Sequence, residues 1–267
     1  LYMLTSEVNF NDIWALTGIP VSPFDAHEED VQITGSGGIA LVAALGSEAR
    51  AEGRIKVGDL VTVYSGTNDL LSPMVGNDPM YADFAIQGYE TATGSHAQFL
   101  AVQAPQMHKV PPDLTLEAAG SYVLNLGTIA RCLFTTLQIA PGRTLFVEGA
   151  ATGTGLDALR SAVRTGLQVT GLVSSSERAR FITQGQGAVG AINRKDARLA
   201  ALFTPVPEEP EAARAWEAAG AVLVEEYRRL NGGRLADYVV SHAGETAFAR
   251  SFQLLAEGGT LAFYGAS

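Results

Sequence analysis

Apolar residues follow two different patterns in the two parts of the chain. Up to about residue 120 they form short β-like runs that glycine, proline and asparagine interrupt, at residues 1–8, 38–45, 59–64 and 97–102. Residues 65–93 form a connection with little periodicity that is too long for an ordinary turn. We therefore expect a β-rich, irregular first part whose long connection is either functional or disordered.

From about residue 115 onward, apolar runs alternate with stretches of helical pattern. The predicted strands are residues 144–148, 169–173, 188–192, 238–241 and 260–264, and the predicted helices are 116–137, 154–165, 176–184, 205–230 and 246–255. This alternation is typical of a parallel sheet with crossover helices. The predicted fold class is α/β, with a domain at residues 1–120 followed by a doubly wound domain at residues 121–267.

Composition narrows the class of protein. The chain has 267 residues, is 47% hydrophobic and carries a net charge of −10, which fits a soluble globular protein that does not bind nucleic acid. No apolar run reaches the roughly 18 residues that a membrane span needs, and no leader is apparent, so we expect a cytoplasmic protein without a membrane partner. The chain starts inside one predicted strand and stops just after another, so we expect it to be part of a longer protein.

Thiolate and metal chemistry find little support in the sequence. A single cysteine, Cys132, excludes an internal disulfide and any zinc site of three or four thiolates, and its place in a predicted helix favours packing over nucleophilic chemistry. His27, His96 and His108 are scattered without ligand spacing and are expected on loops or the surface. We expect no metal. A nucleophile elbow and a Walker loop are also missing from the sequence.

A glycine-rich segment, Gly149-Ala150-Ala151-Thr152-Gly153-Thr154-Gly155, follows the first strand of the second part and opens a helix. Glycines let the backbone approach a pyrophosphate, and a helix N-terminus offers free N–H groups and a partial positive charge. Our candidate cofactor-binding residues are therefore Gly149, Ala151, Thr152, Gly153 and Thr154. Because the strict G-x-G-x-x-G spacing is absent, a plain strand-to-helix turn remains the alternative.

The end of the next strand points to the kind of dinucleotide. Where NAD-binding sheets usually carry Asp or Glu, this chain has Ser174 and Ser175, followed by Arg178, and Arg194 follows the third strand. A carboxylate there would repel a 2′-phosphate, whereas hydroxyls and guanidinium groups bind it with charge-assisted hydrogen bonds. NADPH is the predicted cofactor. The alternative is that these arginines are solvated charges at helix starts.

Several segments resemble the medium-chain dehydrogenase/reductases of the zinc-free quinone and enoyl reductase branch, and within it the crotonyl-CoA carboxylase/reductases. They are residues 8–14, 20–24, the insertion 65–93 with Gly88-Tyr89-Glu90-Thr91 near its end, 173–175, 192–194 and the insertion 205–230. The chain also resembles the acryloyl-CoA reductase domains of propionyl-CoA synthases, which are multidomain fusions. The resemblance covers nearly the whole chain and implies a partial GroES-like catalytic domain followed by a partial NADP-binding Rossmann domain.

The resemblance implies NADPH-dependent reduction of a short-chain 2-enoyl-CoA, acryloyl-CoA to propionyl-CoA, by hydride transfer to the β-carbon and protonation of the enolate. Carboxylating relatives quench the enolate with CO2, so a reductive carboxylase is one alternative and a non-catalytic NADPH-binding module is another. The implied partners are the enoyl-CoA substrate, further catalytic domains of the same parent chain and a second copy in a homo-oligomer.

The resemblance also implies a set of catalytic residues. Asn11 and Glu90 match family residues that line a pocket for CO2 or ordered water, Tyr89 lies beside them, and Asp12 is placed to orient water or Asn11. Tyr89 stands where carboxylating members have Phe. As alternatives, Asn11 and Asp12 cap a helix that begins at Ile13, and Glu90 is a solvated charge.

Two further residues are implied on the cofactor side. Thr128 matches a residue that approaches the nicotinamide amide from the first helix of the nucleotide domain. His242 follows the fourth predicted strand, at the sheet edge where cofactors bind in such folds, although it also fits a residue that only lines the crevice.

Overall fold

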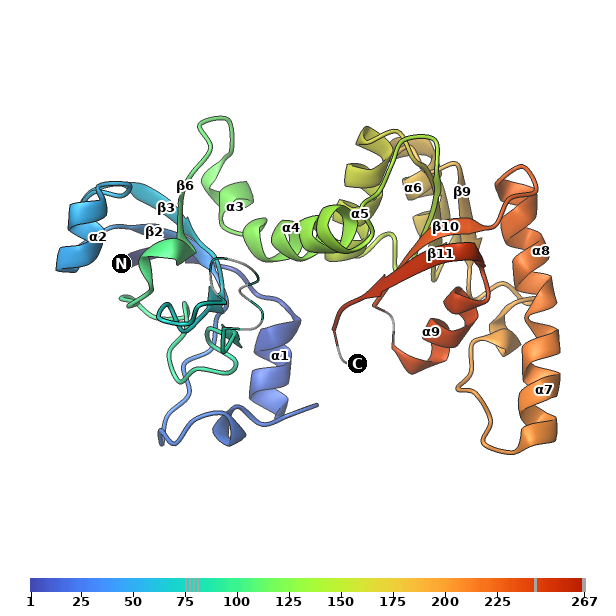
Figure 1. Cartoon of the computed structure of the whole chain (residues 1–267), viewed down its shortest axis with the longest axis horizontal. Helices are drawn as coiled ribbons and strands as arrows, with labels where there is room; N and C mark the ends of the chain where they lie inside the picture. The colour runs from blue at the N-terminus through green and yellow to red at the C-terminus, as the bar shows by residue number, and fades with distance from the viewer. Residues whose placement is uncertain (75, 77, 79, 81, 243, 266–267) are drawn as a thin grey trace. The chain divides into compact units, whose positions relative to one another are not determined.

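The chain divides into two compact units, Leu1–Leu124 and Asn125–Ser267. The computed structural model describes residues 1–74, 76, 78, 80, 82–242 and 244–265, and Figure 1 labels the elements used below. None of the helices in these described residues is long and apolar enough to cross a membrane.

The first unit is built on an antiparallel sheet of four strands in the order β1-β2-β3-β6. These strands are β1 (Tyr2–Ser6), β2 (Gly38–Leu41), β3 (Leu60–Val63) and β6 (Met107–Lys109). Inward-facing apolar side chains form its core: Ala40, Val42, Ile55, Val61, Val63, Leu100 and Met107. The strand predicted at residues 97–102 is absent. That segment runs beside β1 through main-chain hydrogen bonds but makes a single isolated bridge, between Tyr2 and Phe99.

Short helices and turns connect these strands. They are α1 (Phe10–Thr17), the 3-10 turn η1 (Pro23–Asp25), α2 (Ser47–Glu52), the 3-10 turn η3 (Ala104–Gln106) and α3 (Leu116–Ala119). The long connection at 65–93 contains a two-stranded ribbon of β4 (Gly66–Thr67) and β5 (Ala85–Ile86). Buried Gln87 anchors it, because its side chain donates to the Ala101 carbonyl at 3.2 Å and accepts from Gln106 at 2.7 Å.

The single helix predicted over residues 116–137 is instead three pieces. After α3 the chain turns and continues as α4 (Val123–Ala130) and then as a π-helical turn, η4 (Arg131–Thr136). Two contacts from the sheet of the first unit explain the break. Thr62 donates its hydroxyl hydrogen to the Ala119 carbonyl at 3.0 Å, and a Cβ at Gly120 would lie 2.5 Å from the Thr5 hydroxyl.

The second unit is an α/β fold whose parallel sheet has the strand order β11-β10-β7-β8-β9. Its strands are β7 (Thr144–Val147), β8 (Gln168–Val173), β9 (Gly190–Asn193), β10 (Ala236–Ser241) and β11 (Leu255–Phe263). Its helices are α5 (Gly153–Arg164), α6 (Ser176–Gly185), α7 (Pro210–Ala219), α8 (Ala221–Leu230) and α9 (Glu245–Phe252), and a 3-10 turn, η5 (Ala200–Leu202), precedes α7. The predicted alternation of strands and helices, and with it the α/β class, is confirmed.

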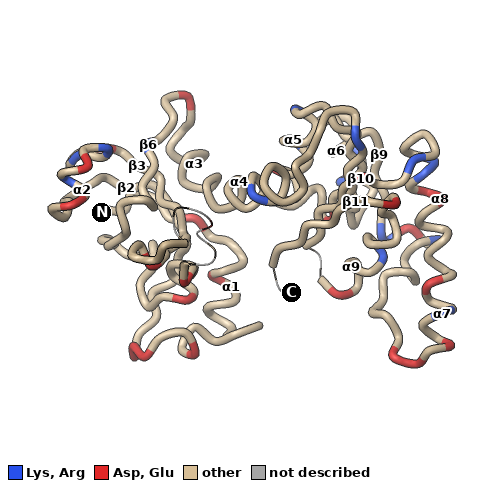
Figure 2. Tube along the Cα trace, viewed as in Figure 1, with Lys and Arg blue, Asp and Glu red and all other residues tan. Residues whose placement is uncertain are grey.

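Two apolar clusters fill the second unit. One packs α5 and η4 against the sheet through residues such as Leu159 and Leu133, and the other packs α8 against it through Leu223 and Tyr227. Cys132 is buried in the first cluster, as predicted. The stretch predicted as one helix over 205–230 is broken at Gly220, which packs against Arg250 and Gln253 of the α9 region. Acidic and basic side chains both lie along α7 and α8, and arginines gather where α8 ends (Figure 2).

Candidate functional site

The strand order of the second unit reverses between β7 and β10, where a crevice is expected at the carboxyl ends of the strands. The chain runs outward from β7 to β8 and β9, then crosses back to place β10 on the other side of β7. In open α/β sheets, ligands bind where the strand order reverses in this way. The residues that follow β7 and β10 are Glu148 to Thr152 and His242, so the predicted loop and the predicted histidine meet at this point.

The loop after β7 has the local geometry of an anion-binding turn. Gly149 adopts a left-handed conformation with φ of 54°, and Thr152 caps α5 by accepting from the Gly155 N–H while donating to the Gly149 carbonyl at 2.8 Å. Gly155 packs so closely on that carbonyl that a Cβ would overlap it. The first turn of α5 is thereby held directly against the loop.

The residues predicted to recognise a 2′-phosphate lie together at the ends of β8 and β9. Ser175 caps α6 by accepting from the Arg178 N–H, and the Arg178 guanidinium donates to the Ser174 hydroxyl at 3.0 Å. The Arg194 N–H donates to the carbonyl of Val173 at 2.9 Å, which places Arg194 beside the same strand end. The Ser174 hydroxyl and the Arg178 guanidinium meet here, and Ser174 stands directly after β8.

His242 lies against the glycine loop and belongs to a buried cluster. Its ring stacks on Tyr264 with centroids 5.1 Å apart, and its backbone N–H donates to the carboxylate of Glu148, a fully buried residue, at 3.1 Å. A Cβ at Gly149 would lie 2.8 Å from the ring. Burial lowers the pKa of His242, and the opposing Glu148 charge is the smaller influence. The ring is therefore neutral near pH 7, and its buried Nε2 has no hydrogen-bond partner among the described residues.

A pocket of about 400 Å³ opens beside His242, at the carboxyl ends of β10 and β11. Its lining is largely apolar, with polar groups on one side: Val206, Ser241, His242, Gly244, Glu245, Phe248, Ala249, Phe263, Tyr264 and Gly265. Phe248 and Phe263 meet edge to face at 5.8 Å. A mostly apolar cavity with a few polar groups suits a flat organic ring.

Helix α4 lies close to the glycine-rich loop that follows β7. Asn125 in α4 lies close to Gly153, because a Cβ on that glycine would be 3.2 Å from the Asn125 amide nitrogen. Thr128, the predicted nicotinamide-side residue, is half-buried three residues further along α4. The proposed cofactor residues of α4, β7, β8 and β10 thus all belong to the second unit.

In the first unit, the predicted residues Asn11 and Asp12 lie in the first turn of α1, not before it. The helix begins at Phe10, and its cap is Asn9, which accepts from the Asn11 N–H at 2.8 Å. Asp12 completes a capping box by accepting from the Asn9 N–H at 2.7 Å. The alternative of a helix that begins at Ile13 is wrong, although Asp12 does take part in capping. Both side chains are buried, and the Asn11 amide donates to the Ser36 hydroxyl at 3.3 Å.

Tyr89 lies close to the same helix. It is 8% exposed, its ring lies 6.2 Å from that of Trp14 in α1, and its hydroxyl donates to the Val21 carbonyl at 3.0 Å. Glu90 is exposed, and its carboxylate accepts from the Ile86 N–H at 2.7 Å. Gln32 holds this turn from outside by donating to the carbonyls of Gly88 and Thr91.

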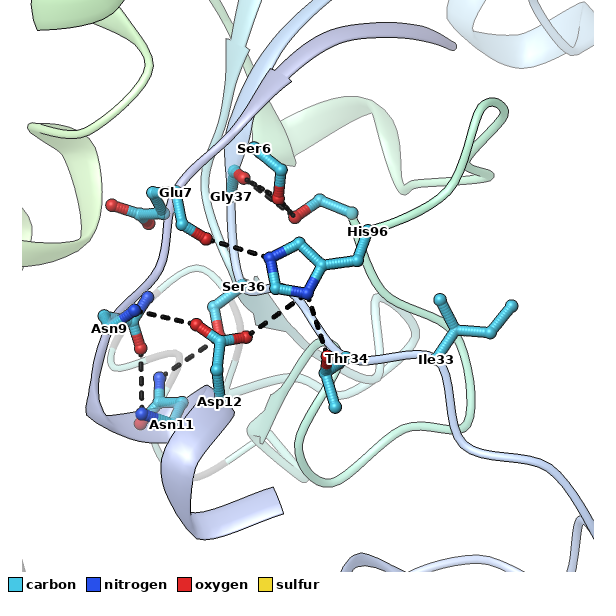
Figure 3. A network of polar contacts seen from close by, with 12 residues as sticks. Ser6, Glu7, Asn9, Asn11, Asp12, Ile33, Thr34, Ser36, Gly37 and His96 are labelled. Carbon is cyan, nitrogen blue, oxygen red and sulfur yellow. Dashed lines mark hydrogen bonds and ion pairs between the residues drawn. The ribbon is translucent and has the colours of Figure 1, made fainter. Parts of the chain in front are cut away.

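Two residues that sequence reasoning did not select lie next to Asn11 and Asp12 (Figure 3). His96 forms an ion-pair contact of 3.8 Å with the carboxylate of Asp12. Glu7 follows β1, and burial, with a smaller contribution from the Asp12 charge, raises the pKa of its carboxyl to about 7. Neither has a local sequence signal, since the partners of His96 are more than 60 positions away. Among the described residues, no group of three His, Cys, Asp or Glu is arranged to hold a metal ion.

Comparison with known proteins extends these observations. No family model matches the chain. The crotonyl-CoA carboxylase/reductase of Cereibacter sphaeroides is 36% identical over 263 residues, which cover 96% of this chain and 60% of that protein. A crotonyl-CoA reductase of Streptomyces collinus is 27% identical over 275 residues, with 97% and 59% covered. The chain spans about three fifths of the length of these curated relatives.

Solved structures agree in fold over the whole chain. The crotonyl-CoA carboxylase/reductase AntE in complex with NADP has a TM-score of 0.88 and 28% identity, covering 99% of this chain and 66% of that one. The 2-octenoyl-CoA carboxylase reductase CinF, in complex with NADP and 2-octenoyl-CoA, has a TM-score of 0.87 and 26% identity, covering 100% and 61%. In sequence and in fold, this chain is therefore similar over nearly its whole length to crotonyl-CoA carboxylase/reductases.

Proposed function

We propose that this chain is the greater part of an NADPH-dependent enoyl-CoA reductase, which adds a hydride to the β-carbon of a 2-enoyl-CoA and leaves an enolate at the α-carbon. The observation that carries the proposal is the crevice between β7 and β10, with a capped glycine loop on one side and Ser174 with Arg178 at the neighbouring strand end. The names of the relatives, carboxylase/reductases and reductases of enoyl-CoA, supply the substrate class.

The residues at the crevice fit the dinucleotide. Gly149 and Gly153 bring backbone without a side chain to the loop and to the start of α5, and the buried Nε2 of His242 lies beside Gly149 without a protein partner among the described residues. Gly149, Ala151, Thr152, Gly153 and Thr154 would hold the pyrophosphate, and Ser174, Ser175, Arg178 and Arg194 the 2′-phosphate. The apolar pocket beside His242 suits the nicotinamide half, with Thr128 as a further contact. When bound, NADPH supplies the hydride.

Asn11, Asp12, Tyr89 and Glu90 are the proposed residues around the reacting carbons. The α-carbon of the enolate needs an electrophile, either a proton or CO2. The buried Asn11 amide has hydrogen-bonding groups to orient CO2 or a water molecule, and Tyr89 packs beside its helix. The relatives named carboxylase/reductases favour CO2, which makes reductive carboxylation the better-supported reading.

Plain reduction of acryloyl-CoA to propionyl-CoA is the second candidate. It is favoured by Tyr89, which brings a phenol to a position where the resemblance implies phenylalanine in carboxylating members. The Tyr89 hydroxyl donates its hydrogen to the Val21 carbonyl. Its oxygen can still accept a hydrogen bond, and in this way it gives the site an additional polar group. A polar site stabilises an ordered water better than it stabilises CO2, so it favours quenching of the enolate by a proton.

The deciding experiment is NADPH oxidation by the intact protein with acryloyl-CoA and with crotonyl-CoA, each with and without labelled bicarbonate, followed by mass determination of the products. Label in a carboxylated acyl-CoA establishes the reductive carboxylase. Saturated acyl-CoA under both conditions establishes the plain reductase. Tight NADPH binding without oxidation on either thioester would overturn the enzymatic proposal and leave a non-catalytic NADPH-binding module.

A further inference from the structure

His96 lies at the centre of a polar cluster in the first unit that includes Asn11 and Asp12 (Figure 3). The proposed function gives His96 itself no role. Its position is set by main-chain pairing between two distant segments. The His96 N–H donates to the Thr34 carbonyl at 3.0 Å, and the Ser95 N–H donates to the Gly35 carbonyl at 2.9 Å. The imidazole is therefore carried on a fixed piece of backbone and directed at the start of α1.

Both ring nitrogens of His96 have partners. Nε2 lies 3.1 Å from the Glu7 carbonyl oxygen, and Nδ1 lies 2.8 Å from the Thr34 hydroxyl and 3.8 Å from Asp12 Oδ1. A carbonyl oxygen only accepts, so Nε2 carries a hydrogen. The Thr34 hydroxyl can donate to Nδ1 or accept from it. The contact between Nδ1 and the Asp12 carboxylate is attractive only when Nδ1 also carries a hydrogen. With a hydrogen on Nε2 alone, the lone pair of Nδ1 would face the carboxylate.

Asp12 needs this neighbour because its carboxylate is 3% exposed. One oxygen accepts from the Asn9 N–H at 2.7 Å, while the other, Oδ1, is buried and has no hydrogen-bond donor among the described residues. A buried carboxylate oxygen without compensation is costly. The His96 imidazole is the group that the structure places against this oxygen, with Nδ1 3.8 Å from it.

The same two segments that His96 joins also hold Asn11. The Asn11 N–H donates to the Asn9 side chain within the α1 cap, and the Asn11 amide donates to Ser36, two residues after Thr34. His96 contacts the α1 cap through Asp12 and the second segment through Thr34. His96 therefore adds a side-chain link between the two supports of Asn11.

We propose that His96 is a positioning residue for Asn11, which it holds in place by bridging Asp12 of the α1 cap to Thr34 of the segment that carries Ser36. This inference rests on the proposed function, which places Asn11 at the reacting carbons. His96 itself touches neither substrate nor cofactor in this assignment and acts through Asn11. The titratable groups that face the bridge are Asp12 from α1 and Glu7 from the segment after β1.

The test is a double-mutant cycle in the intact protein with the enoyl-CoA that it reduces. We expect His96→Ala to lower kcat by about tenfold while the Kd for NADPH stays unchanged, since a misdirected Asn11 affects the reacting carbons and not the cofactor. Asn11→Ala with His96→Ala should have the kcat of Asn11→Ala alone. The proposal would be overturned if the loss of kcat in the double variant equalled the product of the losses in the two single variants. Full activity of His96→Ala would overturn it as well.

Two further variants guard against a mere folding defect. His96→Gln keeps a donor for the Glu7 carbonyl and an acceptor for Thr34 but lacks the ring that spans to Asp12, so we expect a kcat between those of wild type and His96→Ala. His108→Ala changes an exposed histidine of β6 in the same unit and should leave kcat unchanged. A kcat for His96→Gln no better than that for His96→Ala, or an equal loss in His108→Ala, contradicts the bridge.

Hydrogen exchange measured by mass spectrometry separates this inference from the proposed function, because it needs no substrate. In His96→Ala the amides of Asn9 to Asp12 should exchange faster than in wild type, while those of β10 in the second unit should not change. If wild type reduces no enoyl-CoA, the proposed function fails and exchange alone decides whether His96 holds the turn. Unchanged exchange at that turn rejects the positioning role.

Discussion

At the scale of single residues, the carboxyl group of Glu7 makes the stability of the protein depend on pH. Its folded pKa of about 7 lies above the usual value of 4.5. The native state therefore binds more protons than the unfolded state between these values, and this contribution to stability is lost as the pH rises from 4.5 through about 7. We expect Glu7→Gln to gain stability relative to wild type by on the order of 1 kcal/mol between pH 5 and pH 8, a change in Tm of roughly 2–4 °C.

Thermal unfolding of both proteins at the two pH values measures this effect. Glu48→Gln, which changes an exposed carboxylate of α2, is the matched control and should show no such pH-dependent difference. A Tm difference between Glu7→Gln and wild type that is the same at pH 5 and pH 8 would show that the Glu7 carboxyl does not titrate in this range.

Arg178 carries the prediction about cofactor choice. Its guanidinium donates to the Ser174 hydroxyl, and the proposed function assigns both groups to the 2′-phosphate of NADPH. We expect Arg178→Ala to raise the Kd for NADPH about 10- to 100-fold, the loss of a charge-assisted hydrogen bond, and to leave the Kd for NADH nearly unchanged. Titration of cofactor fluorescence measures both constants. Arg180→Ala, on the same helix, is the control, and an equal loss there would mean that general charge, not a contact, binds the phosphate.

At the scale of elements, the start of α5 depends on Gly155. A Cβ at that position would overlap the Gly149 carbonyl, so Gly155→Ala must push α5 away from the loop. We expect a loss of about 1–3 kcal/mol of stability and at least a tenfold weaker binding of NADPH, measured by thermal unfolding and by cofactor titration. Gly185→Ala, at the end of α6 where nothing lies within 4 Å, should change neither property. Equal behaviour of the two variants would contradict close packing of loop and helix.

At the scale of the whole molecule, the two compact units have cores that share no residue. Leu159→Ala removes a fully buried side chain from the core of the second unit and should cost about 2–5 kcal/mol. We expect faster hydrogen exchange in β7, β8 and β10 but not in β2 and β3, and the reverse for Val61→Ala in β3. Exchange that rises equally in both units after either change would mean that they unfold as one.

Local chemistry made much of the second unit predictable from sequence. Short apolar runs gave its five strands within a few residues, because a buried parallel strand needs a continuous apolar segment. The glycine loop was also visible, since a tight turn between a strand and a helix depends on three or four neighbouring residues. The cap of α1 is equally local, but the alternative of Asn11 and Asp12 as caps of a helix from Ile13 was wrong: the cap is Asn9 and the helix begins at Phe10.

Sequence alone determined the order of strands and helices, the glycine loop and the hydroxyl and guanidinium groups that follow β8, because each depends on neighbours a few positions away. Tertiary structure alone decided where helices break, which buried groups meet, and that His96 and Asp12 form a pair. Thr62 ends α3, Arg250 and Gln253 pack on Gly220, and Glu148 reaches His242 across 94 positions. The physical reason is that these contacts depend on the path of the whole chain, which no local window of residues contains.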